Sequence, residues 1–106
     1  MNNVLISRFG LNERDINTLT TIFMRHPCIK EIRIFGSRAN GNFKKGSDID
    51  LAIMNKGVSE REVNNIKAEL EESSLPYLVD IIDFNTLQHK ELKEQIERRG
   101  VSFYKK

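Results

Sequence analysis

Residues 32–54 have the sequence IRIFGSRANGNFKKGSDIDLAIM, in which the pair Gly36-Ser37 is followed after ten residues by Asp48-Ile49-Asp50. The β-branched and aromatic residues before Gly36 predict a strand that stops at this glycine. From Asp48 onward, carboxylates alternate with aliphatic side chains, so a second strand would carry acidic residues on one face and apolar residues on the other. The polar stretch between the two strands is punctuated by glycine and asparagine and predicts a long loop.

Hydrophobic periodicity and capping residues predict the elements that surround this segment. Asn12 followed by Asp15 marks the start of one helix, and Ser59 with Glu62 matches the capping box of another. The strand after that helix is nearly continuous in apolar residues, which is expected of a strand covered on both faces. The expected helices are residues 12–25, 59–72 and 88–99, and the expected strands are residues 29–35, 48–54, 77–84 and a short edge strand 101–104.

The order of these elements predicts where the polar residues meet. If the first two strands are antiparallel neighbours joined by the loop, Ser37 and Asp48 fall at the same end of the sheet. The helix over residues 59–72 then serves as a right-handed crossover that makes the third strand parallel to the second. Asp80, early in the third strand, returns to the end that carries Asp48 and Asp50. The sequence therefore predicts an α+β fold of α/β-like character, a mixed sheet with helices packed on it, in a single domain over residues 1–106.

Three carboxylates gathered at one sheet end favour a particular chemistry. They would repel one another unless they were protonated or bridged by a cation. Mg²⁺ is the natural bridge, because it prefers oxygen ligands and typically takes one or two carboxylates together with substrate phosphates. The Gly36-Ser37 turn offers close backbone approach, a hydroxyl and amide donors for phosphate oxygens. Together these groups indicate phosphoryl or nucleotidyl transfer.

This pattern resembles the nucleotidyltransferase superfamily that includes DNA polymerase beta, whose signature is Gly-Ser, a spacer, Asp-x-Asp and a third Asp on a later strand. The short chain, Arg38-Ala39 after the serine, and the segment SDIDL resemble its minimal nucleotidyltransferase (MNT) branch, whose members are often paired with HEPN-domain toxins. The resemblance covers residues 29–83. It implies the polymerase beta-like nucleotidyltransferase fold.

The resemblance also implies an activity and a set of roles. The reaction would be transfer of AMP from ATP to a hydroxyl, which in the MNT branch is a tyrosine of the partner HEPN toxin, so that the protein acts as an antitoxin. Asp48 and Asp50 would ligate Mg²⁺, with two ions expected, and Asp80 would share a metal or orient and deprotonate the acceptor. Gly36 and Ser37 would hold the terminal phosphates.

Several other polar residues have more than one interpretation. Arg38 would either contact phosphate through its planar fork or be a surface arginine on a mobile loop. Asp83 has the opposite strand parity to Asp80 and is expected at a strand end or as a cap. The pair Lys44-Lys45 is expected to be solvated rather than to attract the triphosphate. Neither histidine has a partner at zinc spacing, so no catalytic histidine is assigned.

Composition limits the classes of partner. The chain has 106 residues with 17 Lys and Arg against 15 Asp and Glu, a formal charge of +2 that is too small to predict direct nucleic-acid binding. The single cysteine, Cys28, has no intrachain partner and is expected to be a small buried hydrophobe. The stretch MNNVLISRFG lacks a leader pattern, and no apolar run approaches the roughly 20 residues that cross a bilayer, so a cytoplasmic location is expected.

Two other functions compete with protein adenylylation. A non-catalytic antitoxin would neutralise the toxin by binding alone, but clustered carboxylates cost stability and have no evident value to a simple interface. An adenylyltransferase acting on a small molecule would resemble antibiotic-modifying relatives, which usually carry an additional acceptor-binding domain. The sequence leaves open whether the protein forms a homo-oligomer.

Overall fold

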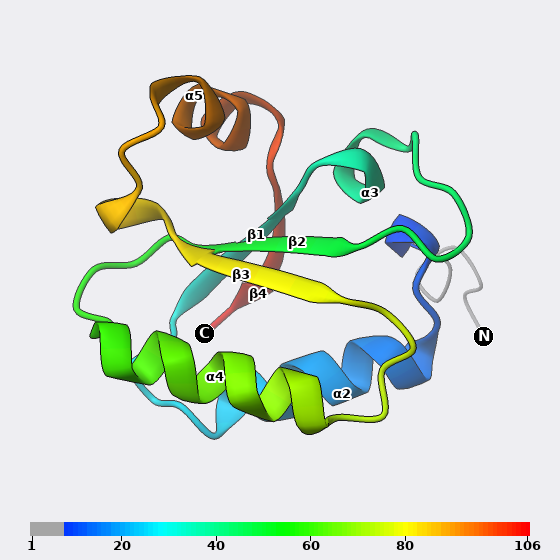
Figure 1. Ribbon diagram of the computed structural model, residues 1–106, viewed down its shortest axis with the longest axis horizontal. Helices are drawn as coiled ribbons and strands as arrows, with labels where there is room; N and C mark the ends of the chain where they lie inside the picture. Colours follow the sequence, from blue (N-terminus) through cyan, green and yellow to red (C-terminus); the bar gives the residue numbers. More distant parts are fainter. Residues whose placement is uncertain (1–7) are drawn as a thin grey trace.

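A mixed four-stranded sheet organises the chain in the computed structural model, which describes residues 8–106 (Figure 1). Residues 1–7, on which the expectation about a leader largely rests, lie outside the described residues. The strand order is β3-β2-β1-β4. β1 is antiparallel to β2, and β2 is parallel to β3, which confirms both predicted pairings. β4 pairs with β1 in antiparallel direction and is the edge strand expected near the end of the chain. The strands are β1 (Glu31–Phe35), β2 (Ile49–Ile53), β3 (Val79–Asp83) and β4 (Val101–Lys105).

The helices lie on both faces of this sheet. Two long helices cover one face, and a third helix packs against the other face (Figure 1). None of the helices in residues 8–106 is long and apolar enough to cross a membrane. The helical elements are η1 (Arg8–Gly10), α2 (Glu13–Met24), α3 (Ser37–Asn40), α4 (Glu60–Glu72), η2 (Phe84–Thr86) and α5 (Lys90–Arg99).

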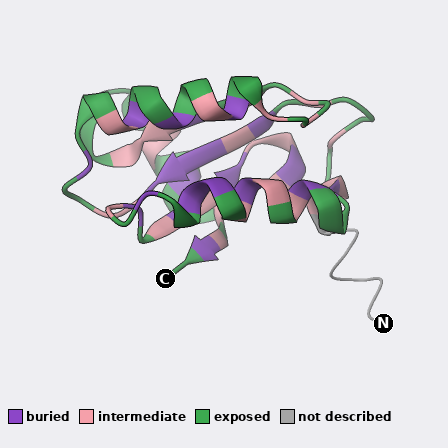
Figure 2. Cartoon of the chain, turned by 90° about the horizontal axis from the view of Figure 1, so that it is seen from below, coloured by how far each residue is buried: buried purple, intermediate pink, exposed green. Residues whose placement is uncertain are grey.

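The predicted caps begin both long helices. The Asn12 side chain accepts a hydrogen bond from the Asp15 amide at 2.8 Å, and the Asp15 carboxylate accepts one from the Asn12 amide at 3.2 Å. The Ser59 hydroxyl accepts a hydrogen bond from the Glu62 amide at 3.1 Å at the start of α4. Both helices turn their buried residues toward the sheet and their exposed residues outward (Figure 2). The caps therefore fix where each helix begins, and the apolar stripe fixes which side it buries.

Alternation along β2 separates a large core from a small one. Ile49, Leu51 and Ile53 are fully buried in the cluster shared with α2 and α4. Ala52 points to the other face, where it packs with Ile96 of α5 in a smaller cluster. Because side chains two residues apart share a face, Asp50 lies on the α5 side of the sheet. The sheet thus presents its acidic positions on the face that is less completely covered.

Two expectations about local structure are wrong. The segment after Gly36 begins with α3 rather than with an irregular loop, because Gly36 and Gly41 take φ values of +76° and +81° and so bracket a single helical turn. β3 is an edge strand and is not covered on both faces. Ile81 is buried, whereas Asp80 is exposed and Ile82 is only half-buried. Sequence periodicity cannot show which strand lies at the edge of the sheet.

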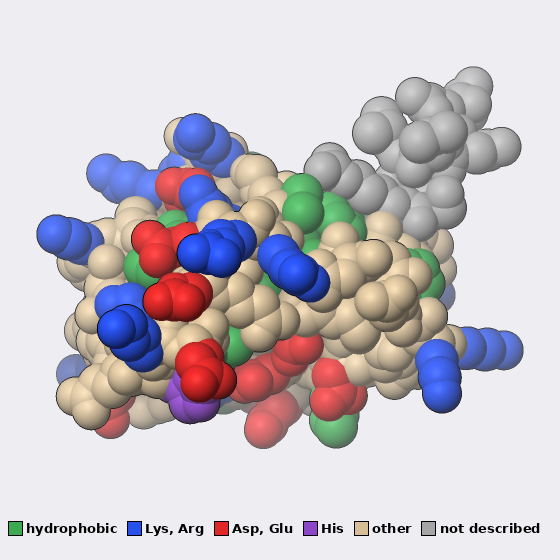
Figure 3. Space-filling model, turned by 90° about the horizontal axis from the view of Figure 1, so that it is seen from above, with side chains coloured by type: hydrophobic (Ala, Val, Ile, Leu, Met, Phe, Trp, Pro, Cys, Tyr) green, Lys and Arg blue, Asp and Glu red, His purple; other side chains and the backbone are tan. Residues whose placement is uncertain are grey.

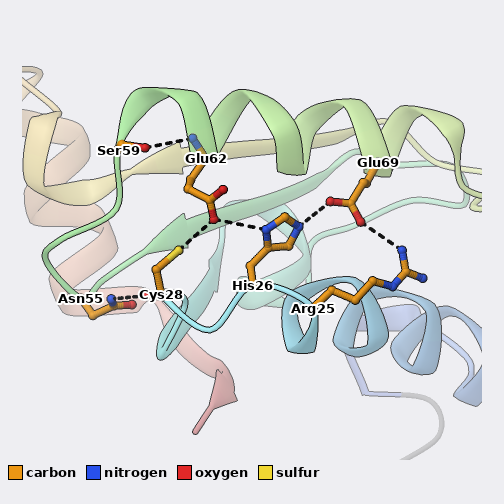
Figure 4. Close-up of polar contacts among 7 residues, drawn as sticks. All are labelled: Arg25, His26, Cys28, Asn55, Ser59, Glu62 and Glu69. Atoms are coloured by element: carbon orange, nitrogen blue, oxygen red, sulfur yellow. Dashed lines mark hydrogen bonds and ion pairs between the residues drawn. The ribbon is translucent and has the colours of Figure 1, made fainter.

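A polar cluster joins the connection between α2 and β1 to α4 (Figure 4). The buried His26 ring faces Glu62 at 3.3 Å through Nδ1 and contacts Glu69 through Nε2. Arg25 donates to Glu69 at 3.0 Å, and the Cys28 thiol donates to Glu62 at 3.1 Å. Hydrogen bonds from Cys28 and His26 lower the pKa of Glu62. Cys28 is partly buried against the main hydrophobic core, so its prediction as a buried hydrophobe is confirmed in part, and its thiol is in addition hydrogen-bonded.

Candidate active site

The parallel pairing of β2 and β3 brings two of the predicted carboxylates together. Asp50 lies directly opposite Asp80 in the register, on neighbouring strands that are about 4.8 Å apart. Asp48 precedes β2 by one residue, and the Ile49 amide donates to the Leu78 carbonyl at 2.9 Å. This hydrogen bond continues the pairing of β2 with β3 up to Ile49, the residue that follows Asp48. The structure therefore places Asp48, Asp50 and Asp80 at the same end of the sheet, as predicted, and their chemical roles stay predictions.

The electrostatics of Asp50 reflect this crowding. Burial raises the pKa of the Asp50 carboxyl, and the charges of Asp80 and Asp48 raise it further. Desolvation and like charges both disfavour the ionised form of a carboxyl group. The half-buried Asp50 therefore lies in a place where an added positive charge would be stabilising.

The backbone of Gly36 lies directly against the Asp50 carboxylate. A Cβ atom added to this glycine would lie 2.5 Å from Asp50 Oδ2, closer than such atoms approach. The φ value of Gly36, +76°, also belongs to a region that other residues rarely adopt. Ser37 follows as the first residue of α3. The backbone of the Gly36-Ser37 turn therefore reaches the acidic cluster closely because it carries no side chain at this point.

The carboxylate oxygens of the site suit a Mg²⁺ ion whose remaining ligands come from water and substrate. Within residues 8–106, no group of three His, Cys, Asp or Glu side chains is arranged to hold a metal ion. Mg²⁺ does not require such a group, because it commonly binds one or two carboxylates and completes its shell with water and substrate phosphates. Asp48 and Asp50 carry carboxylate oxygens that could bind such an ion, and their charges repel one another. The donor set therefore fits an ion that binds together with a triphosphate.

Charge is unevenly distributed over the face that carries the site. Seen from above, basic and acidic side chains are mixed on the left, further acidic side chains lie along the lower edge, and further basic side chains lie at the right-hand end (Figure 3). Lys44 and Lys45 are both exposed in the segment after α3, as predicted for a solvated pair. A polar groove between α2 and α4 lies on the other side of the sheet. The chemistry of the carboxylates, rather than the groove, indicates the site.

Arg38 does not occupy either of its predicted positions. Only 3% of this residue is exposed, which contradicts the interpretation as a surface arginine. Its Nε and Nη2 atoms donate to the Ser47 carbonyl at 3.0 and 2.8 Å, and Nη1 donates to the Phe9 carbonyl at 2.8 Å. A guanidinium bound to backbone in the interior is not presented to a phosphate. Its prediction as a phosphate contact therefore has no support in this geometry.

Residues 17–106 match the family described as Polymerase beta, Nucleotidyltransferase. The chain belongs to this family. A curated relative from Haemophilus influenzae, named probable protein adenylyltransferase MntA, is 36% identical, with coverage of 76% of this chain and 71% of that protein. The match spans the predicted Gly-Ser and Asp-x-Asp segments as well as both later helices. The resemblance inferred from the sequence is thus confirmed at the level of the family.

Solved structures of toxin–antitoxin complexes share the fold of this nucleotidyltransferase. A toxin–antitoxin crystal structure with AMP-PNP aligns with a TM-score of 0.70 at 21% identity, covering 87% of this chain and 74% of that one. A Shewanella oneidensis complex of a tri-AMPylated HEPN toxin with an MNT antitoxin aligns with a TM-score of 0.63 at 19% identity, covering 86% and 70%. These likenesses confirm the polymerase beta-like nucleotidyltransferase fold.

Sequence reasoning missed the internal position of Arg38 in this nucleotidyltransferase. One signal was present, because Gly41 follows Ala39 and Asn40 at the distance of a helix C-cap and so favours a short helix over a mobile loop. The prediction for Asp83 is confirmed, since its carboxylate accepts a hydrogen bond from the Asn85 amide at 3.0 Å and caps η2. Local caps can be predicted from spacing, but burial of a charge cannot.

Replacing Asp50 with Asn should raise the melting temperature of the nucleotidyltransferase by a few degrees at pH 7 in the absence of divalent ions. The folded state holds the Asp50 proton more tightly than the unfolded state, so this group favours folding below its ordinary pKa of 3.8 and loses that contribution as pH rises through the raised value. Differential scanning calorimetry from pH 3 to pH 7 would measure the difference, which should vanish at pH 3. A lower melting temperature for the variant at pH 7 would contradict the crowding of carboxylates.

Proposed function

We propose that this nucleotidyltransferase transfers AMP from ATP to a hydroxyl group of a partner protein. The observation that carries the proposal is the placement of Asp50 opposite Asp80, with the pKa of Asp50 raised and Gly36 against its carboxylate. The relative named as a protein adenylyltransferase supports AMP as the transferred group and a protein as the acceptor. The fold shared with a toxin–antitoxin complex containing AMP-PNP supports a nucleoside triphosphate as donor.

Asp48 and Asp50 would hold Mg²⁺, and Gly36 with Ser37 would hold the terminal phosphates. Two ions of this kind neutralise charge on the phosphates and steady the incoming and leaving oxygens when they are bound. The open backbone at Gly36 lets phosphate oxygens approach the amides of the turn, and the Ser37 hydroxyl adds a further donor. These residues would therefore hold the triphosphate beside Asp50 and Asp80.

Asp80 is suited to receive the acceptor. It is exposed on the edge strand, directly beside Asp50, so an incoming hydroxyl can reach it from solvent. In the proposed step the acceptor oxygen bonds to the α-phosphorus, the bond from that phosphorus to the oxygen bridging to the β-phosphate breaks, and pyrophosphate leaves. The acceptor proton passes to the Asp80 carboxylate or to solvent through it. The product is an AMP ester of the acceptor.

The acceptor we propose is a tyrosine of a HEPN-domain toxin, which makes this protein an antitoxin. The Shewanella oneidensis structure is described as a tri-AMPylated HEPN toxin with its MNT antitoxin, and it shares this fold. An AMP group would add charge and bulk to the toxin, so a small catalytic domain could silence a larger partner. Binding without transfer and adenylylation of a small molecule are the competing functions that an experiment must separate.

The test is incubation of the protein with ATP, Mg²⁺ and a candidate HEPN-domain partner protein, followed by intact-mass measurement. We expect the partner to gain the mass of one or more AMP groups, and a partner whose candidate tyrosine is replaced by phenylalanine should gain fewer. An ATP analogue that cannot be cleaved between the α- and β-phosphates is the matched control. Inhibition of the toxin without any gain in mass would instead establish a binding antitoxin.

A further inference from the structure

Arg38 is a charged side chain enclosed by the segments that build the site. Besides its hydrogen bonds to the carbonyls of Ser47 and Phe9, its guanidinium carbon lies 4.6 Å from the centre of the Tyr77 ring and 5.3 Å from the centre of the Phe43 ring. Within residues 8–106, no carboxylate is at ion-pair distance from it. Burial of a cation is unfavourable unless its donors are satisfied, and here backbone carbonyls and ring faces satisfy them.

Two contacts of Arg38, those with Ser47 and Tyr77, lie close in sequence to residues of the proposed site. Arg38 itself follows Ser37 in α3, and Ser47 directly precedes Asp48. Tyr77 lies three residues before Asp80, where the chain enters β3. One guanidinium therefore links the three segments that carry the proposed phosphate-binding turn, the first metal-binding carboxylate and the carboxylate that faces the acceptor.

The four residues before Asp48 form a small turn of their own. The Ser47 amide donates to the Lys44 carbonyl at 3.0 Å, and the Lys44 amide donates to the Ser47 hydroxyl at 2.8 Å, which closes a small turn. These bonds hold the turn together but do not attach it to the rest of the protein. The two donations from Arg38 attach the carbonyl of Ser47, so they fix the point from which Asp48 extends.

The backbone at Phe9, which accepts the third hydrogen bond of Arg38, has an unusual conformation. Phe9 takes a φ value of +61°, which is uncommon for a residue with a side chain and persists only where the surroundings determine it. Its carbonyl accepts the third hydrogen bond of Arg38. A Cβ atom on Gly10 would lie 2.3 Å from the Phe43 ring, so the missing side chain makes room for that ring. The enclosure of Arg38 therefore depends on several unusual local features at once.

We propose that Arg38 is a positioning residue that holds Asp48, the Gly36-Ser37 turn and the entry to β3 in fixed relation. This inference rests on the proposed function for its catalytic consequence. It assigns Arg38 an action through the site residues and no contact with the triphosphate, since the guanidinium is buried and its donors face backbone.

The first test replaces Arg38 with lysine and measures AMP transfer and ATP binding separately. Lysine keeps the charge but loses the planar fork that makes three directed bonds and stacks on two rings. We expect kcat to fall by about 10- to 100-fold, because displacement of a reacting group by about 1 Å can cost that much. The Kd for ATP should change by less than about threefold. Arg61→Lys, at an exposed position on α4, is the matched control and should behave as the wild type.

Two outcomes of this test would overturn the proposal. Unchanged kcat in a folded Arg38→Lys protein would show that the site does not depend on the guanidinium. A rise of tenfold or more in the Kd for ATP with kcat preserved would show that Arg38 binds phosphate. If Arg38→Lys melts below the assay temperature, Tyr77→Leu removes one ring face only and should lower kcat in the same direction, and no decrease there would reject the proposal.

Amide hydrogen exchange separates this inference from the proposed function. In Arg38→Lys we expect exchange to accelerate by about tenfold or more at residues 47–50 and 77–80, with little change in α5 and β4, because the described contacts of Arg38 are to Phe9, Phe43, Ser47 and Tyr77. This result would support the positioning role even if the wild-type protein transferred no AMP to any partner. Uniform acceleration over the whole sheet would instead indicate general destabilisation and would reject the specific role.

Discussion

Asp50→Asn should lower the rate of AMP transfer by about 10³-fold or more while the protein remains folded. The substitution preserves the shape of the side chain but removes the charge that would hold Mg²⁺ beside the α-phosphate. Loss of several kcal/mol of stabilisation in the transition state corresponds to a decrease of this size. Because the pKa of Asp50 is raised by burial and by Asp80 and Asp48, removal of its charge should not weaken the fold. Single-turnover transfer assays beside far-UV circular dichroism would measure both effects.

Asp83→Asn is the matched control for this substitution. Asp83 belongs to the same strand as Asp80 but faces the other side of the sheet and caps η2 through the Asn85 amide. Asparagine is also a favourable cap, so both the fold and the transfer rate should stay close to the wild type. Equal activity of Asp50→Asn and Asp83→Asn would reject the assignment of Asp50 as a metal ligand. Added Mg²⁺ should raise the melting temperature of the wild type more than that of Asp50→Asn.

Gly36→Ala should both destabilise the protein and disrupt the site. The φ value of +76° with ψ of −154° lies in a region that is open almost only to glycine, and a residue forced into it costs about 1–3 kcal/mol. The added methyl group would lie 2.5 Å from Asp50 Oδ2, so the carboxylate has to move as well. We expect urea denaturation to show the loss of stability and the transfer rate to fall by about 100-fold.

Gly41→Ala provides the matched control for the methyl group at Gly36. Gly41 also has a positive φ value, +81°, but nothing lies within 4 Å of a Cβ atom built there. The substitution should therefore cost only the backbone strain of a left-handed residue, about 1 kcal/mol. Transfer by Gly41→Ala should stay near the wild-type rate. A similar loss of activity in both variants would mean that strain in α3, and not the approach of Gly36 to Asp50, limits the reaction.

Much of the site could be predicted because it depends on short-range rules. Alternation in residues 48–54 assigns Asp50 to the face opposite Ile49 and Leu51, and the structure confirms this separation. The crossover helix makes β3 parallel to β2, so Asp80 returns beside Asp50. Helix starts at Asn12 and Ser59 follow from side chains that bond amides three residues away.

Other features depend on contacts between residues that are far apart in the chain. Arg38 contacts Phe9, which lies 29 residues earlier in the sequence, and Tyr77, which lies far later in the sequence. No local pattern indicates that these three residues meet. His26 reaches Glu62 and Glu69 in the same way, across 36 and 43 residues. Both side chains are polar and yet buried, because distant partners satisfy their hydrogen bonds.

The sequence by itself determined the mixed sheet, the crossover and the gathering of Asp48, Asp50 and Asp80 at one end, because strand parity and chain direction follow from local periodicity. Only the tertiary structure decided that β3 lies at an edge with Asp80 open to solvent, and that Arg38 is buried with its donors on the backbone carbonyls of Ser47 and Phe9. The physical reason is that burial is a property of the whole packed chain. A side chain is enclosed only when segments distant in sequence cover it and supply partners for its polar atoms.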